Sequence, residues 1–423
     1  MEPFIHLHVH TQYSLLDGQA SIDALINKAY DDGMRAIAVT DHGNMFGIKE
    51  FFNKVNKKNG KVQGTIKDLQ KELKTLGAKE ERTDEENTRL AEIPGLLEKA
   101  KGDLFKPIIG CECYCARNHR LQKTEKEDRS GWHLIVLAKN MTGYKNLIKM
   151  VSQSWTEGFY GRPRIDKELL EQHREGLIVC SACLGGEIPQ KIMHGNIHAA
   201  EEAVLWFKQL FGEDYYLELQ RHETHRADAD QTVYKHQVEV NKVLIELAHK
   251  HGVKIIATND VHFVNEEDAD AHDRLICLST GKDLNDPNRM RYTKQEWMKT
   301  TAEMNQIFGD IPDALRNTLE IADKVEFYSI DSGPIMPTFN IPEDFGTEEG
   351  YRQKLTEQDL FDEFTRDENG NVVLSQADAE AKIKKLGGYD KLYRIKLEAD
   401  YLAKLTYEGA KPLYGEPLSE EVK

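Results

Sequence analysis

Up to Phe263, the hydrophobic positions of the chain fall into short apolar runs separated by stretches with helical spacing. Seven runs have the length and composition of buried strands, and they span residues 4–8, 36–39, 107–115, 134–138, 177–180, 215–219 and 253–258. Two of the intervening helical stretches, 22–32 and 237–251, are each followed directly by a glycine, which is a signal that a helix ends there. Strands and helices in alternation predict parallel β/α units, and seven strands favour a barrel-like α/β sheet over a sandwich.

One stretch interrupts this alternation. Residues 54–101 are rich in lysine and glutamate, with leucines at helical spacing. The pattern predicts a charged helical insertion, folded as a helical hairpin that breaks near Thr83 and is interrupted again at Pro94 and Gly95. The simplest interpretation is that this insertion lies on the surface in contact with solvent and contributes no functional residues.

The alternation of apolar runs and helical stretches stops after Phe263. Residues 268–280, 300–308 and 312–325 have helical spacing, and Ser332, Pro337 and Pro342 mark an extended connector. Residues 346–423 are strongly charged, with helical spacing and a hairpin-like turn at 367–371 but no obvious core. We therefore expect three parts: a barrel over 1–265, a helical extension and connector over 266–340, and a charged helix-rich segment over 341–423. Because the last residues, 420–423, do not resemble a natural ending, we expect a fragment of a longer chain.

Composition narrows the class of protein. The hydrophobic fraction of 39% is enough for a core, and the formal charge of −16 argues against a freestanding nucleic-acid binder, which would usually be basic. It leaves open a domain whose nucleic acid is held by bound metals or by neighbouring domains. No apolar run is long enough for a transmembrane helix, and the first residues lack the features of a secretory signal. The six cysteines, three of which alternate along one apolar run, then indicate reduced thiols in a cytoplasmic protein that has no membrane partner.

Histidines and carboxylates gather near the predicted strands. His8 and His10 are two apart, so a strand would project both imidazoles to one face, although His6 shares that parity. Asp17 follows in a turn that could return a carboxylate to the same point. The spacing alone therefore does not decide whether His6 and His8 or His8 and His10 bind a metal.

Three further apolar runs also contain carboxylates or histidines. Asp41 and His42 end one apolar run, Glu112 lies within another, and Asp260 and His262 end a third. Each has an ordinary alternative: a helix cap, a lysine-paired acid or a turn residue. Their repetition at strand ends, where functional groups of parallel β/α folds collect, favours a shared site. Mixed nitrogen and oxygen ligands suit zinc, manganese or iron, and paired ions suit hydrolysis of phosphate esters.

These motifs resemble those of the polymerase and histidinol phosphatase (PHP) family. The resemblance begins with residues 8–10 and Asp17, with Thr-Asp-His-Gly at 40–43 and with Asn-Asp-Val-His at 259–262. It is most specific for the PHP domains that begin the alpha subunits of bacterial DNA polymerase III. The segments that carry this closer resemblance are 4–18, 105–112, 133–140, 161–166 and 183–187. It covers residues 1–340 well, and residues 401–409 resemble the entry to the polymerase palm.

The resemblance implies a distorted (β/α)7 TIM-like barrel with a trinuclear metal centre. The residues that match the family's nine ligand positions are His8, His10, Asp17, His42, Glu112, His133, Cys183, Asp260 and His262. His133 and Cys183 enter the site only through this resemblance, since His133 begins its apolar run. Three divalent ions, zinc or manganese with iron as a further option, are implied. The thiolate suits zinc or iron and is a poor ligand for magnesium.

The activity implied is a metal-dependent 3′–5′ exonuclease that proofreads the 3′ end of a DNA primer strand. Asp41 would orient a ligand imidazole, and Arg162 and Arg164 would contact phosphate, with a plain surface-loop role as the alternative for both arginines. The partners implied are the DNA, the rest of the polymerase chain, the sliding clamp and proofreading subunits. Polymerisation itself is not expected here, because no paired aspartates on apolar strands follow Phe263.

Two rival hypotheses belong to other functional classes. The domain could bind metal only for stability and act as a scaffold for the polymerase, without hydrolysing anything. It could also be a standalone small-molecule phosphatase, an interpretation that does not account for the polymerase-like motifs.

Overall fold

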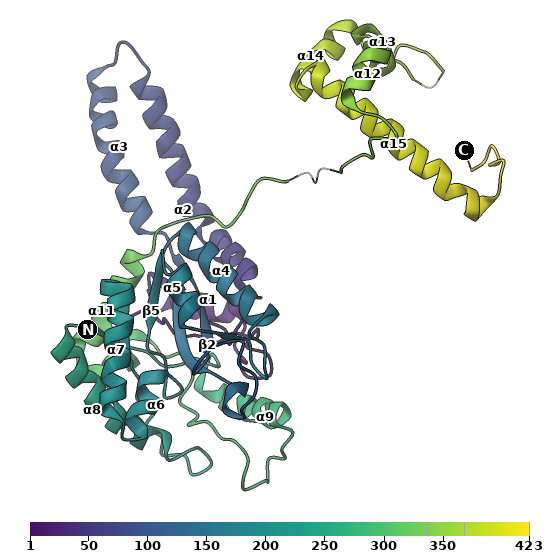
Figure 1. Ribbon diagram of the computed structural model, residues 1–423. Coiled ribbons are helices and arrows are strands. Elements are labelled where there is room, and N and C mark those ends of the chain that lie inside the picture. Colours follow the sequence, from purple (N-terminus) through teal and green to yellow (C-terminus); the bar gives the residue numbers. More distant parts are fainter. Residues whose placement is uncertain (336, 338, 368, 423) are drawn as a thin grey trace. The chain divides into compact units, whose positions relative to one another are not determined.

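Six of the seven predicted runs are strands of one seven-stranded sheet (Figure 1). The strands are β1 (Ala36–Val39), β2 (Lys106–Cys115), β3 (Trp132–Ala138), β4 (Arg164–Ile165), β5 (Leu177–Cys180), β6 (Tyr215–Leu219) and β7 (Lys254–Ala257). The short strand β4 was not predicted. The computed structural model describes residues 1–335, 337, 339–367 and 369–422.

The sheet is mixed, with the order β1-β2-β3-β5-β6-β7 and with β4 paired to β2. β3 runs antiparallel to both β2 and β5, whereas the other pairs are parallel. The prediction of parallel units throughout is therefore wrong around β3. The reason is the connection: residues 116–131 contain only a single turn of 3-10 helix, Glu127–Arg129, and a parallel neighbour would need a longer crossover.

The first apolar run, 4–8, is not a regular strand, which corrects the prediction for this segment. Its continuation nevertheless bonds on both sides. The amide of Thr40, just after β1, donates to the carbonyl of Val9 at 2.8 Å, and the amide of His10 donates to the carbonyl of Val261, just after β7, at 2.7 Å. The N-terminal segment thus lies between the two ends of the sheet and closes the curve into a barrel.

Helices surround this sheet (Figure 1). Those of the barrel and its extension are α1 (Ile22–Asp31), α2 (Ile48–Gly77), α3 (Asp84–Gly102), α4 (Met141–Thr156), α5 (Lys167–His173), α6 (Glu187–Met193), α7 (Ile197–Phe211), α8 (Val233–His251), α9 (Ala269–Thr280), α10 (Thr301–Phe308) and α11 (Pro312–Lys324). The helices predicted at 22–32, 237–251, 268–280, 300–308 and 312–325 are confirmed. The helix end predicted before Gly252 is confirmed as well, since this glycine caps α8 with φ near +61°.

Side chains alternate along the strands between two apolar clusters. Ile37 and Val39 of β1 pack with the surrounding helices. Ala36 and Ala38 belong to a second cluster with inward residues of the other strands and with Ile321 of α11. This second cluster fills the interior of the barrel, and α11 contributes to it.

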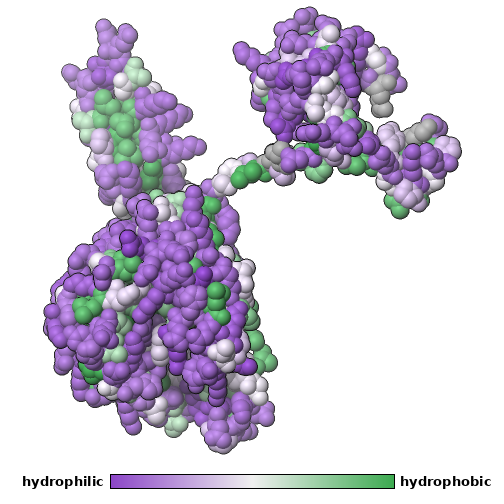
Figure 2. Space-filling model, viewed as in Figure 1, coloured by the Kyte–Doolittle hydropathy of each residue, from purple (hydrophilic) through white to green (hydrophobic). Residues whose placement is uncertain are grey.

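Helices α2 and α3 form the predicted hairpin, which projects from the barrel (Figure 1). Its apolar seam is made by Leu69, Leu76, Ile93 and Leu97, and it is visible as a green stripe between charged faces in Figure 2. The predicted break is confirmed at Thr83, which caps α3. The predicted interruption at Pro94 is wrong, because α3 continues through it while apolar residues on either side pack against α2.

Shortening Ile93 to alanine should loosen the hairpin without disturbing the barrel. Ile93 is fully buried in the seam, and truncating such a side chain costs about 2–4 kcal/mol. Hydrogen exchange should therefore accelerate in α3 and the outer half of α2, with the barrel strands unchanged. Leu96→Ala, on the exposed side of α3, serves as the matched control. Equal loss of protection in the strands would show that the hairpin is part of the barrel's cooperative unit.

The chain divides into two compact units, Met1–Asp331 and Ser332–Lys423. The second contains α12 (Glu348–Lys354), α13 (Glu357–Thr365), α14 (Gln376–Leu386) and α15 (Tyr389–Tyr414). The expectation that residues 346–423 have no core is wrong, since Leu360, Ile383, Leu392 and Tyr393 form a small one. Of the predicted turn at 367–371, Glu368 lies outside the described residues, as do Met336 and Thr338 of the connector. Among the helices described, none has the length and apolarity needed to cross a bilayer.

Candidate metal centre

Two carboxylate side chains point into the barrel from its strands, at the end of the barrel where the parallel strands finish. Glu112 has the same inward parity in β2 as Ile108, and Glu218 the same parity in β6 as Tyr216. The antiparallel β3 begins at this end, so His133, at its start, lies where the other strands stop. This topology explains a position that strand-end reasoning alone would not have chosen.

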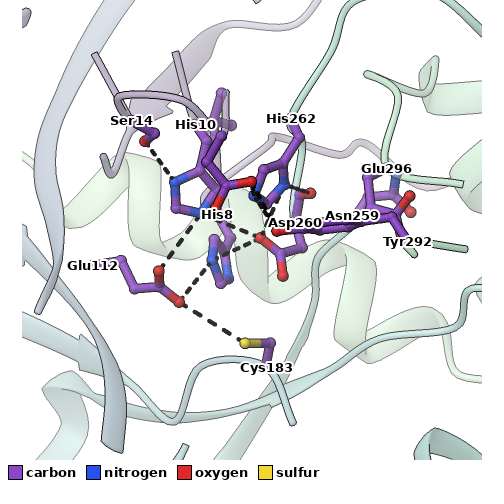
Figure 3. A network of polar contacts seen from close by, with 12 residues as sticks. His8, His10, Ser14, Glu112, Cys183, Asn259, Asp260, His262, Tyr292 and Glu296 are labelled. Carbon is purple, nitrogen blue, oxygen red and sulfur yellow. Dashed lines mark hydrogen bonds and ion pairs between the residues drawn. The ribbon is translucent and has the colours of Figure 1, made fainter. Parts of the chain in front are cut away.

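All nine residues predicted as ligands are found at this end of the barrel (Figure 3 shows six of them). His8 and His10 belong to the closing N-terminal segment and Asp17 to the loop after it. The others follow β1 (His42), lie within β2 (Glu112), begin β3 (His133), or come after β5 (Cys183) and β7 (Asp260 and His262).

Glu112 lies at the centre of the cluster. One carboxylate oxygen, Oε1, is 2.8 Å from His133 Nδ1, 3.3 Å from His8 Nε2 and 3.8 Å from Cys183 Sγ. The other, Oε2, contacts His42 Nδ1. Burial alone would raise the pKa of Glu112, but the imidazoles of His133 and His42 lower it well below its usual value. Glu112 is therefore a carboxylate surrounded by nitrogen and sulfur ligands.

Asp260 is a second carboxylate that contacts two of the predicted histidine ligands. Its Oδ1 lies 3.0 Å from His8 Nε2 and 3.2 Å from His10 Nε2. Burial opposes its ionisation, yet His8 and the neighbouring imidazoles lower its pKa well below the usual value. Its backbone has φ near +47°, a conformation that costs energy in a residue other than glycine. Leu16 and Ala182, the residues before Asp17 and Cys183, also have positive φ, so strain is concentrated around the cluster.

The hydrogen bonds that three imidazoles make through Nδ1 turn their Nε2 atoms toward the cluster, where that of His262 also lies 3.4 Å from the hydroxyl of Tyr292. His8 Nδ1 donates to Glu218 Oε1 at 2.6 Å, and His262 Nδ1 donates to the carbonyl of Asp260 at 2.8 Å. His10 Nδ1 donates to Ser14 Oγ at 2.9 Å. Fixing one ring nitrogen in this way orients the other as a metal ligand.

Asp41 acts on the cluster through Ser14. The hydroxyl of Ser14 donates to Asp41 Oδ1 at 2.7 Å, so it can only accept the proton of His10 Nδ1. Asp41 also accepts hydrogen bonds from the amide and the hydroxyl of Thr11. The carboxylate thus lies behind a predicted ligand and is connected to it through the hydroxyl of Ser14.

The charges of the histidines differ. Burial, and then the nearby His42 and His262, lower the pKa of His10 to about 3, so its imidazole is neutral. Burial also opposes protonation of His8, but Asp260 and Glu218 raise its pKa well above the usual value. A metal ion at His8 Nε2 would take the place of that proton.

Five atoms of the cluster are buried without a hydrogen-bond partner among the described residues, namely His8 Nε2, His10 Nε2, His42 Nδ1, Glu112 Oε2 and Asp260 Oδ1. They lie close together but are not aligned as hydrogen bonds, so their lone pairs converge on shared space. The cluster contains three sets of ligand atoms, each within 4.8 Å of one another: His10, His42 and His262; His8, His10 and Glu112; Glu112, His133 and Cys183. This donor chemistry fits several divalent ions with nitrogen, oxygen and sulfur ligands.

Three contributors were missed from the sequence. Glu218 is an acid in an apolar strand, the same signal that singled out Glu112, and it could have been found. Tyr292 donates from its hydroxyl to Asp17 Oδ1 at 2.9 Å, and His272 Nε2 lies 3.9 Å from the same oxygen. Both come from the region after Phe263, where no pattern in the sequence connects them with the barrel.

The two arginines predicted to contact phosphate differ. Arg162 is exposed, and its guanidinium lies 5.5 Å from the ring centre of Tyr114, which stacks on His42. Arg164 is buried and donates to the backbone carbonyls of Gly158 and Arg120. The role predicted for Arg164 does not agree with this geometry, because its guanidinium supports a loop and does not reach solvent.

Replacing Glu218 by glutamine should weaken metal binding by about 10- to 100-fold, because a carboxylate behind a ligand histidine fixes its tautomer and raises its basicity. Titration of the metal-free protein with Zn²⁺ against a competing chelator measures this effect. Glu320→Gln, which removes a carboxylate hydrogen-bonded to Tyr216 of the same strand, is the matched control. Unchanged affinity in Glu218→Gln would show that this carboxylate does not act on the centre.

Comparison with known proteins agrees with this geometry. The family model of the PHP domain matches residues 6–222. Among similar curated proteins, the DNA polymerase III subunit alpha of Borreliella burgdorferi is 41% identical over 84% of this chain and 27% of its own length. That of Treponema pallidum is 36% identical over 85% and 26%, and that of Thermus aquaticus 35% identical over 84% and 25%. The chain thus spans about a quarter of the length of these relatives. It belongs to the PHP domain family, and its homologues are DNA polymerase III alpha subunits.

Proposed function

We propose that this PHP domain is a trinuclear metal-dependent phosphodiesterase that acts as a 3′–5′ exonuclease within a DNA polymerase III alpha subunit. The observation that carries the proposal is the convergence of nine competent ligands, five of which have a buried atom without a hydrogen-bond partner among the described residues. The ligands we propose are His8, His10, Asp17, His42, Glu112, His133, Cys183, Asp260 and His262.

The cluster is open on one side. The side chains of His8, His10 and Glu112 are fully buried, whereas those of Asp17 and His133 are 25% and 26% exposed. A structural metal site is closed by protein ligands, and a catalytic one leaves positions for water and substrate. The exposed edge therefore favours catalysis over a purely structural centre.

Bound divalent ions would polarise the scissile phosphate and make water nucleophilic. The residues of this chain do the positioning. Glu218 and the pair Ser14 and Asp41 hold the tautomers of His8 and His10, and Tyr292 holds Asp17 by a hydrogen bond. Arg162 offers an exposed guanidinium for a phosphate of the strand.

The test is nucleotide release from a DNA strand labelled at its 3′ end, with Mn²⁺ or Zn²⁺ added to the chain and to a longer protein that includes the polymerase. Early release of the 3′ label is expected, and a second strand labelled at its 5′ end should keep its label while it is progressively shortened. No release from either metal-loaded protein would contradict the proposal.

A second candidate is a metal-stabilised scaffold. It is favoured by the spread of the ligands along the chain, from His8 to His262, because ions that join such distant segments would stabilise the barrel whether or not they catalyse. Metal-dependent stability with no hydrolysis of any ester would support it.

For either function, we propose a cytoplasmic setting with the rest of the polymerase chain, the 3′ end of DNA, the sliding clamp and proofreading subunits as partners. The support is the identity of the relatives, which are alpha subunits of a DNA polymerase.

A further inference from the structure

Three aromatic side chains are exposed beside the metal centre. Phe46, Trp155 and Phe159 are 57%, 42% and 46% exposed. The rings of Trp155 and Phe159 are stacked, with centroids 5.5 Å apart and an interplanar angle of 15°, and Phe46 lies 6.2 Å from Trp155. We call these three residues the aromatic ladder. Large exposed aromatic groups in contact with one another mark a binding surface more often than chance exposure.

The ladder is continuous with the candidate metal centre. The indole Nε1 of Trp155 donates to the carbonyl of Gly43 at 2.8 Å, and Gly43 directly follows His42. A Cβ on Gly43 would come within 2.7 Å of Pro163 Cγ and 3.2 Å of the Tyr114 ring, so these elements are tightly packed. The ladder therefore has a fixed position beside the predicted ligand His42.

A positive group lies on the same packed surface. Arg162 is exposed, next to Pro163, and its guanidinium lies over the ring of Tyr114, which also stacks with His42. Flat aromatic faces beside a guanidinium, leading to a centre that would hold cations, fit a ligand with flat bases on an anionic backbone. They do not fit an apolar peptide, because such a peptide has neither an anionic group to pair with the guanidinium nor flat bases to stack on the rings.

We infer that the aromatic ladder binds the unpaired bases of single-stranded DNA and guides its 3′ end to the metal centre. The inference rests on the proposed function and adds the form of the substrate. Successive bases stack on aromatic side chains irrespective of sequence, whereas bases in a duplex are stacked inside the helix and cannot reach the rings. A frayed or mismatched 3′ end would thus be selected over a paired one.

The test is binding by fluorescence anisotropy, at low salt, of the Mn²⁺-loaded chain to a labelled oligothymidylate with phosphorothioate linkages, which resist cleavage. Loss of one stacking residue typically weakens binding by about 5- to 150-fold per base, so Trp155→Ala and Phe159→Ala should each weaken binding by about tenfold or more. An abasic strand of equal length should bind more weakly to the unaltered chain and should be insensitive to both substitutions. Phe327→Ala, which removes an aromatic group 53% exposed elsewhere in the same unit, is the control.

Phe159→Ala keeps the test valid if Trp155→Ala disturbs the loop of Gly43, which elemental analysis of bound metal would detect. Equal binding of the abasic and thymidylate strands, or unchanged affinity in both variants, would overturn the inference and leave the ladder to a protein partner. Because no cleavage is needed, base-dependent binding can be found even where nucleotide release fails, and release can be found where the ladder has no effect.

Discussion

Replacement of Glu112 by glutamine is expected to lower nucleotide release by at least about 100-fold and to reduce the amount of bound metal. Glu112 belongs to two of the three sets of ligand atoms and contacts His42 of the third, and the neutral amide keeps the shape of the side chain while removing its charge. Loss of several kcal/mol of charge stabilisation at a metal centre corresponds to this factor, since about 1.4 kcal/mol is tenfold in rate.

The measurements are elemental analysis after gel filtration and the rate of release from a 3′-labelled strand. Glu213→Gln, which alters an exposed glutamate of the same unit, should change neither quantity. Full metal occupancy together with an unchanged rate in Glu112→Gln would place the chemistry elsewhere in the protein.

Removing the metal with a chelator is expected to lower the melting temperature of the first unit, Met1–Asp331, by roughly 4 °C for each ion lost. An ion at 100 times its dissociation constant stabilises the folded state by about 2.7 kcal/mol, and an unfolding entropy of about 2.1 cal/mol/K per residue means that each kcal/mol shifts Tm by about 1.4 °C in a unit of this length. Calorimetry before chelation, after it, and after Mn²⁺ or Zn²⁺ is restored measures the effect.

The second unit provides an internal control for that experiment. Its helices form their own core, so their transition should not respond to metal. In Glu112→Gln, the shift of the first unit should shrink. A melting temperature unaffected by chelation would count against a metal centre of either the catalytic or the scaffold kind.

Much of the barrel could be predicted because its strands are short, apolar and separated by helices with clear ends. The runs at 36–39 and 177–180 are continuous apolar segments, and Gly252 provides the left-handed residue that ends α8. Strand direction could not be predicted in the same way. β3 reverses because no crossover helix precedes it, and a loop of 16 residues without clear periodicity carries no signal of that kind.

The candidate site was partly visible for a similar reason. His8 and His10 share a face by spacing, and Asp260 and His262 end an apolar strand. His133 and Cys183 carry no local signal, because their positions depend on the reversal of β3 and on the strained turn after β5. Tyr292 and His272 depend on how the segment after the barrel folds back, which pairwise spacing does not encode.

The core of the second unit, in contrast to the barrel strands, could not be predicted from the sequence. Its core draws Leu360, Ile383 and Leu392 from three different helices, so each window of sequence contains too few apolar residues to indicate burial. In the hairpin, the packing of Ile93 and Leu97 against α2 outweighs the tendency of Pro94 to interrupt a helix.

The closure of the barrel by its first segment has a consequence for synthesis on the ribosome. Val9 is made early, but its partner Val261 emerges only about 250 residues later. Until then Phe4, Ile5 and Leu7, all buried in the finished fold, have no complete surface to cover them. The nascent chain therefore exposes these apolar side chains until Val261 has been made, and a chaperone that shields them should raise the yield of folded protein more than one acting on the later helices.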